Sequence, residues 1–162
     1  MKILDLVDDV RSGCKSVLTT MTLEEYKKLS FFAFNNNGNI DGQRSVIKRS
    51  STAAKIRKRM ADDFRKGAIF PQVVLGVLFS TENMQNLDES KFYMLLESVN
   101  EGQISIIDGM QRSNIYFENY EDNKQQKIRV EFWCSDASTK LLYRMLVLNT
   151  GQVPWNTRRQ LE

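Results

Sequence analysis

The spacing of apolar and polar residues divides the chain into alternating helices and strands. Helices are expected where apolar residues recur every three or four positions, over residues 3–11, Leu23–Leu29, Ser51 or Thr52 to Lys66, Glu89–Val99, Met110–Tyr120, and from Asp136 or Ser138 to Asn149–Gly151. Short apolar, β-branched or alternating runs predict strands at residues 16–20, 72–80, 103–107 and 127–134. This order predicts an α+β (α/β-like) fold, a small mixed sheet with flanking helices.

Two of the helices carry boundary signals. Thr22 and Glu25 match a capping box at the start of the first. Ser51 or Thr52 caps the longer one, and Gly67 suits the position after its last turn. The apolar stripe of that longer helix consists of Ala53, Ile56, Met60 and Phe64. This face is expected to pack on the protein, with charged residues opposite.

Polar segments separate these elements. Asn35–Gly42 and Thr81–Asp88 are expected to be loops, and Glu121–Gln126 a turn. We expect one domain over residues 1–162, with residues 1–35 as an N-terminal extension. Residues 150–162 open a last helix without a stop signal, so the chain is either truncated there or ends in a short docked helix.

The composition limits the chemistry. The chain has 162 residues and no histidine. This excludes Ser-His-Asp and Cys-His catalysis, HExxH zinc sites and the 2-His-1-carboxylate iron site. Any catalysis must use carboxylates, Lys, Arg, Ser/Thr, Tyr or bound magnesium.

Two further features point to a soluble protein of the cytoplasm. No apolar run approaches the length of a membrane span. The N-terminal apolar residues are interrupted by Asp5, Asp8 and Asp9, so they do not form the apolar region of a secretory signal. Cys14 and Cys134 are far apart in the sequence and follow no metal-binding spacing. They are expected to be buried or neutral thiols in a reducing compartment.

The charge is concentrated in one segment. Arg44–Gly67 has nine Lys or Arg against two Asp, a net +7, which leaves −4 for the rest of a chain whose net charge is +3. This favours a polyanionic partner such as DNA, although a solvated basic helix face explains it equally well. The candidate DNA-phosphate contacts are Arg49, Lys55 and Arg59.

The strongest candidate for chemistry is the segment ISIIDGMQRS, residues 104–113. A buried strand ends at Asp108, and a helix begins directly after Gly109, whose backbone allows a tight turn. The free N–H groups of the first helical turn can bind an anion, with Arg112 and Ser113 as further donors. Asp108 could bind magnesium, take a proton or cap the helix. The alternative is an ordinary Asp-Gly turn that starts a helix.

The same segment, IIDGMQRSNIY, resembles the signature of the ParB/sulfiredoxin superfamily, whose members carry a G-x-x-R phosphate-binding turn between a strand and a helix. It is most similar to the branch named for its Asp-Gly-Gln-His-Arg motif, which includes the DndB-like regulators of DNA phosphorothioation systems. The order of the other motifs is similar too. A basic helix precedes a G-x-x-F-P strand entry at Gly67–Gln72, and an Asn-rich turn, Leu148–Pro154, follows a later helix.

The resemblance implies that Gly109 and Arg112 bind a phosphate, that Asp108 is the acid of the motif, and that Gln111 and Ser113 lie beside them. This chain has Met-Gln where the family pattern has Gln-His. The turn also lacks the cysteine that sulfiredoxin uses, so reduction of a sulfinic acid is not expected. Nucleotide binding is still expected, because the glycine, the arginine and the helix N-terminus of the motif are present. Proton transfer by a histidine is not expected, because the histidine is absent.

Other candidates depend on weaker signals. Gln43 and Arg44 belong to a second DGQR string, which either begins the basic stretch or faces the same ligand from across a cleft. Asn149 and Thr150 either cap a helix end or contribute polar groups to the site. The two tryptophans, Trp133 and Trp155, are interpreted as core or hinge anchors rather than as base-stacking platforms.

Three functions follow from these observations. The first is a nucleotide-binding domain, with a nucleoside triphosphate and magnesium as ligands and weak magnesium-dependent NTPase activity left open, in a bacterial DNA-modification or phage-defence system. The second is a non-enzymatic DNA-binding or regulatory module. The third is an interaction module without a ligand of its own. A homo-oligomer, or a further domain of the same chain, also stays open as a partner.

Overall fold

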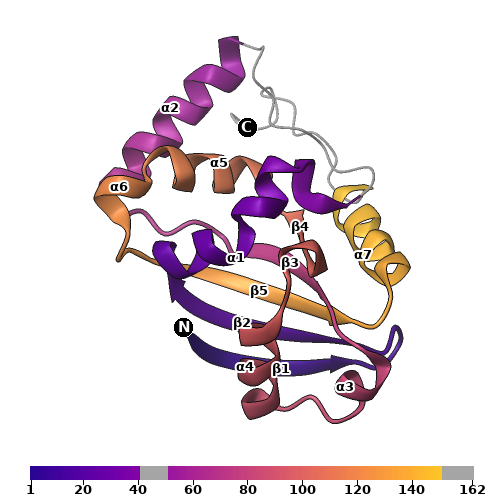
Figure 1. Cartoon of the computed structure of the whole chain (residues 1–162). Helices are drawn as coiled ribbons and strands as arrows, with labels where there is room; N and C mark the ends of the chain where they lie inside the picture. Colours follow the sequence, from indigo (N-terminus) through magenta and orange to yellow (C-terminus); the bar gives the residue numbers. More distant parts are fainter. Residues whose placement is uncertain (41–50, 151–162) are drawn as a thin grey trace.

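The computed structural model of the chain describes residues 1–40 and 51–150, and it contains a five-stranded mixed sheet flanked by helices (Figure 1). The predicted α+β class is therefore confirmed. The strands are β1 (Lys2–Asp9), β2 (Cys14–Thr22), β3 (Val73–Leu78), β4 (Ile104–Asp108) and β5 (Lys127–Ser135). The α-helices are α1 (Leu23–Asn35), α2 (Ser51–Arg65), α3 (Thr81–Gln85), α4 (Glu89–Ser98), α5 (Met110–Glu118), α6 (Tyr120–Asn123) and α7 (Ser138–Thr150), and the short 3-10 helices are η1 (Asn37–Asn39) and η2 (Glu101–Gln103).

The strand order is β1-β2-β5-β3-β4. All neighbours are antiparallel except β3 and β5, which run parallel at the centre. The last strand of the sequence thus joins the N-terminal hairpin to the β3–β4 pair. Residues 1–35, expected as an extension, supply two of the five strands and a helix, so they are part of the sheet domain.

The prediction of a helix over residues 3–11 is wrong, because this segment forms β1. The register between β1 and β2 shifts between Ile3 and Asp5. Ile3 lies opposite Thr19 and Leu6 opposite Val17, so both side chains face the same side of the sheet although they are three residues apart. A β-bulge produces such a change of phase. The bulge therefore gives a strand the apolar spacing of a helix.

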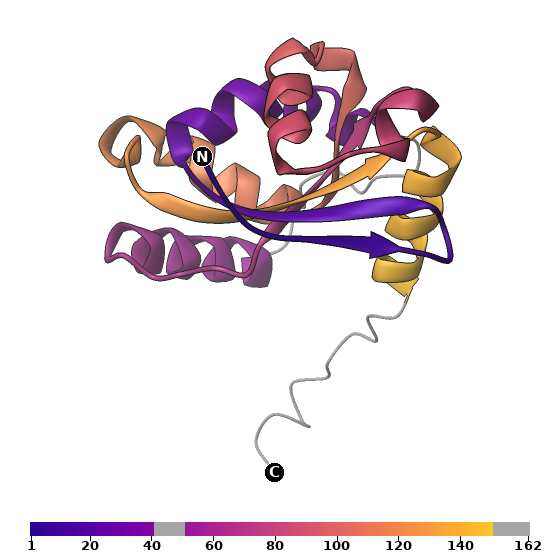
Figure 2. The same ribbon diagram turned by 90° about the horizontal axis from the view of Figure 1, so that it is seen from below.

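One face of the sheet carries the larger core. Val17, Val130, Phe132, Leu75 and Ile106 lie within it and are fully buried. Figure 2 shows α1, α3 and α4 on one side of the sheet, with α2 on the other. The covering helices contribute Leu23, Tyr26, Met84, Phe92 and Leu96 to this core.

Two further segments differ from the predictions. Thr81–Asp88 was expected to be a loop, yet it begins with α3, because Ser80 caps the helix through the N–H of Asn83 and Met84 is buried beneath it. The Thr22–Glu25 capping box is confirmed. The helix that it starts continues to Asn35, beyond the predicted end at Leu29, because Ser30 and Ala33 also pack inward.

The opposite face of the sheet packs against α7. A second core there contains Cys14, Val74, Ile107, Trp133, Leu141 and Met145. The predicted roles of Trp133 as a core residue and of both cysteines as buried free thiols are confirmed. Gly76 makes close packing possible, because a Cβ atom there would lie 2.8 Å from Cδ1 of Leu141 and 3.0 Å from Cδ1 of Ile107.

The buried side chains described for helix α2 lie in its C-terminal half. Ala61 and Phe64 are buried, and Phe64 lies against Tyr116 of α5, with ring centroids 5.1 Å apart. Ile56 was expected on the buried stripe but is 56% exposed. The apolar stripe predicted which face of α2 packs on the protein. It did not predict that this face is exposed at Ile56 and buried at Phe64.

Gly76→Ala tests the packing of α7 on the sheet. The added methyl group must displace Leu141 or Ile107, so we expect the free energy of unfolding to fall by about 1–3 kcal/mol. Gly102→Ala is the control, because nothing lies within 4 Å of a Cβ atom there. Urea denaturation of both variants measures the difference, and equal stabilities would contradict this packing.

Candidate functional site

The predicted phosphate-binding turn lies between β4 and α5. Gly109 precedes the helix with φ of 108°, in the left-handed region that favours glycine. A Cβ atom at this position would also lie only 2.8 Å from Cγ1 of Val73. Glycine is therefore required by the fold itself, so its presence in the motif does not by itself indicate a ligand.

The turn occupies the edge of the sheet and not its parallel centre. β4 is an edge strand, antiparallel to β3, and Asp108 lies opposite Val74 near the start of β3. The carboxyl ends of the parallel pair β3 and β5, at Leu78 and Ser135, are therefore at the other end of the sheet. The rule that places ligands at the carboxyl ends of parallel strands does not apply to Asp108.

Asp108 and Arg112 form an ion pair across the first turn of α5. Nη2 of Arg112 donates to Oδ2 of Asp108 at 2.8 Å, with the two side chains 18% and 35% exposed. Nε of Arg112 is buried and has no hydrogen-bond partner within residues 1–40 and 51–150. The guanidinium group thus keeps at least one unused donor, whose burial without a partner costs free energy.

Ser113 belongs to the core. Its Oγ donates to the carbonyl of Gly109 at 3.0 Å and lies 2.6 Å from the hydroxyl of Tyr26. Because Ser113 has a single hydroxyl proton, Tyr26 is the donor in the second bond. Ser113 is fully buried. It ties α5 to α1 and is not positioned as a further phosphate ligand, and no sequence pattern pointed to Tyr26 as its partner.

The backbone of the turn keeps its anion-binding potential. No side chain of the described residues caps the N-terminus of α5, and the N–H of Ser113 is the first to bond within the helix, to the carbonyl of Gly109. The N–H groups of Met110, Gln111 and Arg112 precede it. Met110 is buried and Gln111 half-buried. Three consecutive N–H groups beside a guanidinium group suit a phosphate.

The remaining predicted residues are not gathered around this turn by the described part of the structure. Gln43, Arg44 and Arg49 lie outside the described residues. Asn149 and Thr150 end α7, as expected, and their side chains also lie outside the description. Lys55 and Arg59 are exposed on α2.

The described residues show neither a metal-ligand cluster nor a membrane-spanning helix. In residues 1–40 and 51–150, no three His, Cys, Asp or Glu side chains gather into a metal site. Magnesium at Asp108 would therefore take most of its ligands from phosphates and water, as this ion commonly does. No helix of the described segments is long and apolar enough to cross a membrane.

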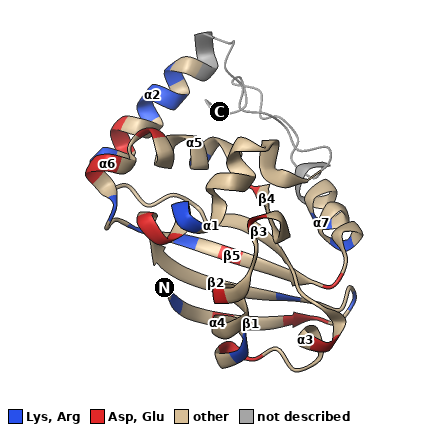
Figure 3. Cartoon of the chain, in the orientation of Figure 1, with Lys and Arg blue, Asp and Glu red and all other residues tan. Residues whose placement is uncertain are grey.

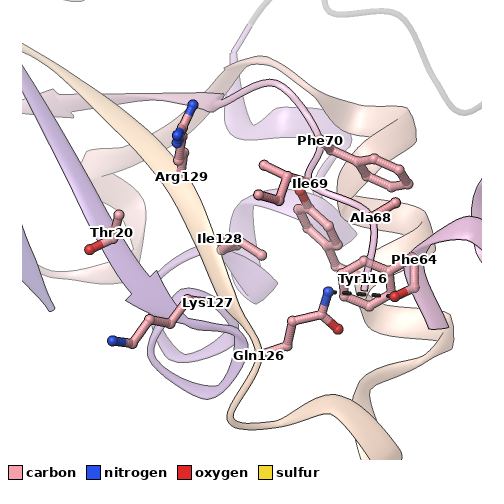
Figure 4. A pocket seen from close by; sticks show the side chains of 10 residues that line it. All are labelled: Thr20, Phe64, Ala68, Ile69, Phe70, Tyr116, Gln126, Lys127, Ile128 and Arg129. Carbon is pink, nitrogen blue, oxygen red and sulfur yellow. Dashed lines mark hydrogen bonds between the residues drawn. The ribbon is translucent and has the colours of Figure 1, made fainter. Parts of the chain in front are cut away.

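A small cavity lies beneath the G-x-x-F-P segment (Figure 4). Its volume is about 160 Å³, and its walls include Phe64, Ile69, Phe70 and Tyr116, with Arg129 at its edge. Small-molecule sites usually measure about 300–1,000 Å³. The cavity is therefore too small for a nucleotide. The G-x-x-F-P segment itself connects α2 to β3.

Comparison of the chain with protein-family models, with curated proteins and with solved structures gives no match.

The burial of Tyr26 gives a testable pH dependence. Burial raises the pKa of Tyr26 to about 12 and also raises the pKa of Tyr116. The folded protein therefore holds these protons to higher pH than the unfolded chain, whose tyrosines ionise near pH 10. The contribution of these two tyrosines to the free energy of unfolding is complete below pH 10. Between pH 10 and about 12 the free energy of unfolding should fall by up to about 1.4 kcal/mol per pH unit for each tyrosine.

Urea denaturation from pH 9 to 12 measures this slope. Tyr26→Phe should flatten it, while lowering the stability at pH 9 by about 1 kcal/mol through the lost hydrogen bond. Tyr143→Phe removes a hydroxyl from a half-exposed side chain and serves as the control. Identical slopes for the two variants would show that the Tyr26 hydroxyl is not held as described.

Proposed function

We propose that this chain is a phosphate-binding domain that takes a nucleotide at the turn Asp108–Arg112. The observation that carries the proposal is the side chain of Arg112, whose Nε is buried without a partner beside the uncapped N-terminus of α5. The guanidinium group of Arg112 and the free N–H groups at the start of α5 are hydrogen-bond donors, and both groups attract a negative charge. A phosphate at this point would accept hydrogen bonds that the described part of the protein leaves unused.

Asp108 determines how such a ligand can enter. Its carboxylate already accepts from Arg112, and it would repel an incoming phosphate. A nucleotide must therefore either displace Asp108 from the guanidinium group or bring magnesium, which the carboxylate and the phosphates could share. The two routes give opposite results when the carboxylate is removed.

Binding and regulation fit the turn better than vigorous catalysis. Gln111 occupies the position where the resembled motif has a histidine, and the chain has no histidine elsewhere. Ser113 is engaged by Tyr26. Asp108 is thus the one group of the turn that could take a proton, so any NTPase activity is expected to be weak. The resemblance supports a setting in bacterial DNA modification or phage defence, in the cytoplasm.

DNA binding through α2 is the second candidate, and it is compatible with the first. Lys55 and Arg59 are exposed one helical turn apart. Figure 3 shows basic residues along α2, the helix whose N-terminal half leaves Ile56 exposed. The exposed basic face of a helix that packs on the core through Ala61 and Phe64 could lie along a phosphate backbone.

Arg112→Gln tests the nucleotide site. Loss of a charge-assisted hydrogen bond is worth about 1.5–3 kcal/mol, so we expect the affinity for ATP or CTP, measured by calorimetry and thermal shift, to fall about 10- to 100-fold. Arg65→Gln is the matched control, since Arg65 also pairs with a nearby aspartate, Asp62, three residues before it. Equal nucleotide affinities for the two variants would overturn the assignment.

Asp108→Asn separates the two routes of binding. Without magnesium, the substitution should strengthen nucleotide binding, because Arg112 loses its internal partner. With magnesium, it should weaken binding if the carboxylate shares the ion with the phosphates. The same calorimetric titration, with and without EDTA, measures both. An unchanged affinity in both conditions would show that Asp108 does not face the ligand.

Lys55→Gln combined with Arg59→Gln tests the DNA surface. Each phosphate contact contributes about 0.9 to the slope of log K against log salt concentration. The double variant should therefore lower the slope for duplex DNA by about 2, measured by fluorescence anisotropy. Lys2→Gln with Lys28→Gln changes the charge equally at exposed positions outside α2. A slope that falls by the same amount in both double variants would contradict a role for α2.

A further inference from the structure

A larger cavity lies between the tip of the β1–β2 hairpin and α7, which are side by side in Figures 1 and 2. Its volume is about 600 Å³, within the range of small-molecule sites. The lining residues are Asp9, Arg11, Ser12, Trp133, Lys140, Tyr143, Arg144 and Val147. None belongs to the turn Asp108–Ser113, so this is a separate place in the fold.

Specific contacts hold the two walls of the cavity together. Nη2 of Arg11 donates to the hydroxyl of Tyr143 at 3.1 Å, and the guanidinium group lies 5.5 Å from the centre of that ring. On the other wall, Lys140 donates to Asp136 at 2.8 Å. A Cβ atom on Gly13 of the hairpin turn would lie 3.6 Å from Nζ of Lys140. The cavity is therefore a defined space between two joined elements.

Trp133 and Arg144 form its most unusual feature. The guanidinium carbon of Arg144 lies 4.3 Å from the centre of the Trp133 ring. Trp133 is 6% exposed. Its Nε1 and the Nε of Arg144 are both buried, and neither has a hydrogen-bond partner among the described residues. The two residues that carry these donors line the cavity, and buried donors without an acceptor cost free energy unless a ligand that reaches them supplies one.

The charges of the lining point to the kind of ligand. The lining has three basic residues, Arg11, Lys140 and Arg144. Because Lys140 is already paired with Asp136, Arg11 and Arg144 are set against the one carboxylate of the lining, that of Asp9. That carboxylate is already engaged, because Oδ2 accepts from the hydroxyl of Ser12 at 2.5 Å and Oδ1 from the N–H of Arg11 at 3.2 Å. The Ser12 hydrogen bond lowers the pKa of Asp9, so Asp9 remains an acceptor. The cavity therefore offers a surplus of donors and positive charge to an oxyanion.

From this arrangement we infer that the cavity binds a small phosphate monoester, with the phosphate on Arg144, the indole N–H of Trp133 and Arg11. A dianionic phosphate matches the two arginines, Arg11 and Arg144, better than a carboxylate does. Tyr143 and Val147, which are 50% and 45% exposed, offer an apolar edge for the organic part of the ligand. This inference is independent of the nucleotide site at Arg112.

Trp133 itself provides the readout. In a Trp155→Phe background it is the single tryptophan of the chain, and a ligand that draws Arg144 from the ring must change its fluorescence. We expect titration with phenyl phosphate to give a saturable change, weaker binding of inorganic phosphate, and at least 10-fold weaker binding of phenylacetate. Comparable affinity for phenylacetate and phenyl phosphate would contradict the choice of a phosphate.

Substitutions locate the signal. Arg144→Gln and Arg11→Gln should each weaken the binding of phenyl phosphate by 10-fold or more. Arg11 lies on the hairpin tip, so its variant remains informative if Arg144→Gln does not fold. Arg112→Gln should leave the titration unchanged, and a loss in that variant would assign the signal to the turn before α5. The absence of a saturable change in the Trp155→Phe protein, or equal affinity in Arg11→Gln, would overturn the inference.

Discussion

The whole arrangement depends on β5, which pairs antiparallel with β2 on one side and parallel with β3 on the other. This strand joins an N-terminal hairpin to the segment that carries the motif. It places Val130 beside Val73, and Val73 in turn lies so close to Gly109 that a side chain there would collide with it. The central strand β5 thus holds the turn before α5 in place through β3, and with it the position of Arg112.

Unused hydrogen-bond donors connect the two candidate sites. Arg112 lies at the start of α5, and Trp133 and Arg144 lie near the hairpin. Each buries a nitrogen that has no partner in the part of the chain that the structure describes. Folded proteins rarely leave such groups without an acceptor, because each one costs free energy. Both places are also positively charged or lie at the positive end of a helix. A protein with donors in surplus at two separate points is better suited to bind anions than to transfer protons.

The elements with strong local signals were predictable. The capping box of α1, the basic helix α2, the strands β3 and β5 and the Asp-Gly turn before α5 all lie where the apolar pattern places them. The failures have physical causes. A bulge near Asp5 gives β1 the spacing of a helix, and α3 depends on the tertiary burial of Met84. The motif residue Ser113 is engaged by Tyr26, a residue 87 positions earlier that no local pattern could associate with it.

The sequence alone determined the fold class, the turn at Gly109, the basic character of α2 and the exclusion of histidine chemistry, because these depend on local periodicity, on backbone freedom and on which residues exist at all. The tertiary structure alone decided which donors remain unpaired. Asp108 pairs with Arg112, Ser113 turns to the core, and the hairpin and α7 meet around Trp133. These outcomes depend on contacts between segments that lie far apart in the sequence, where competing partners differ by small free energies.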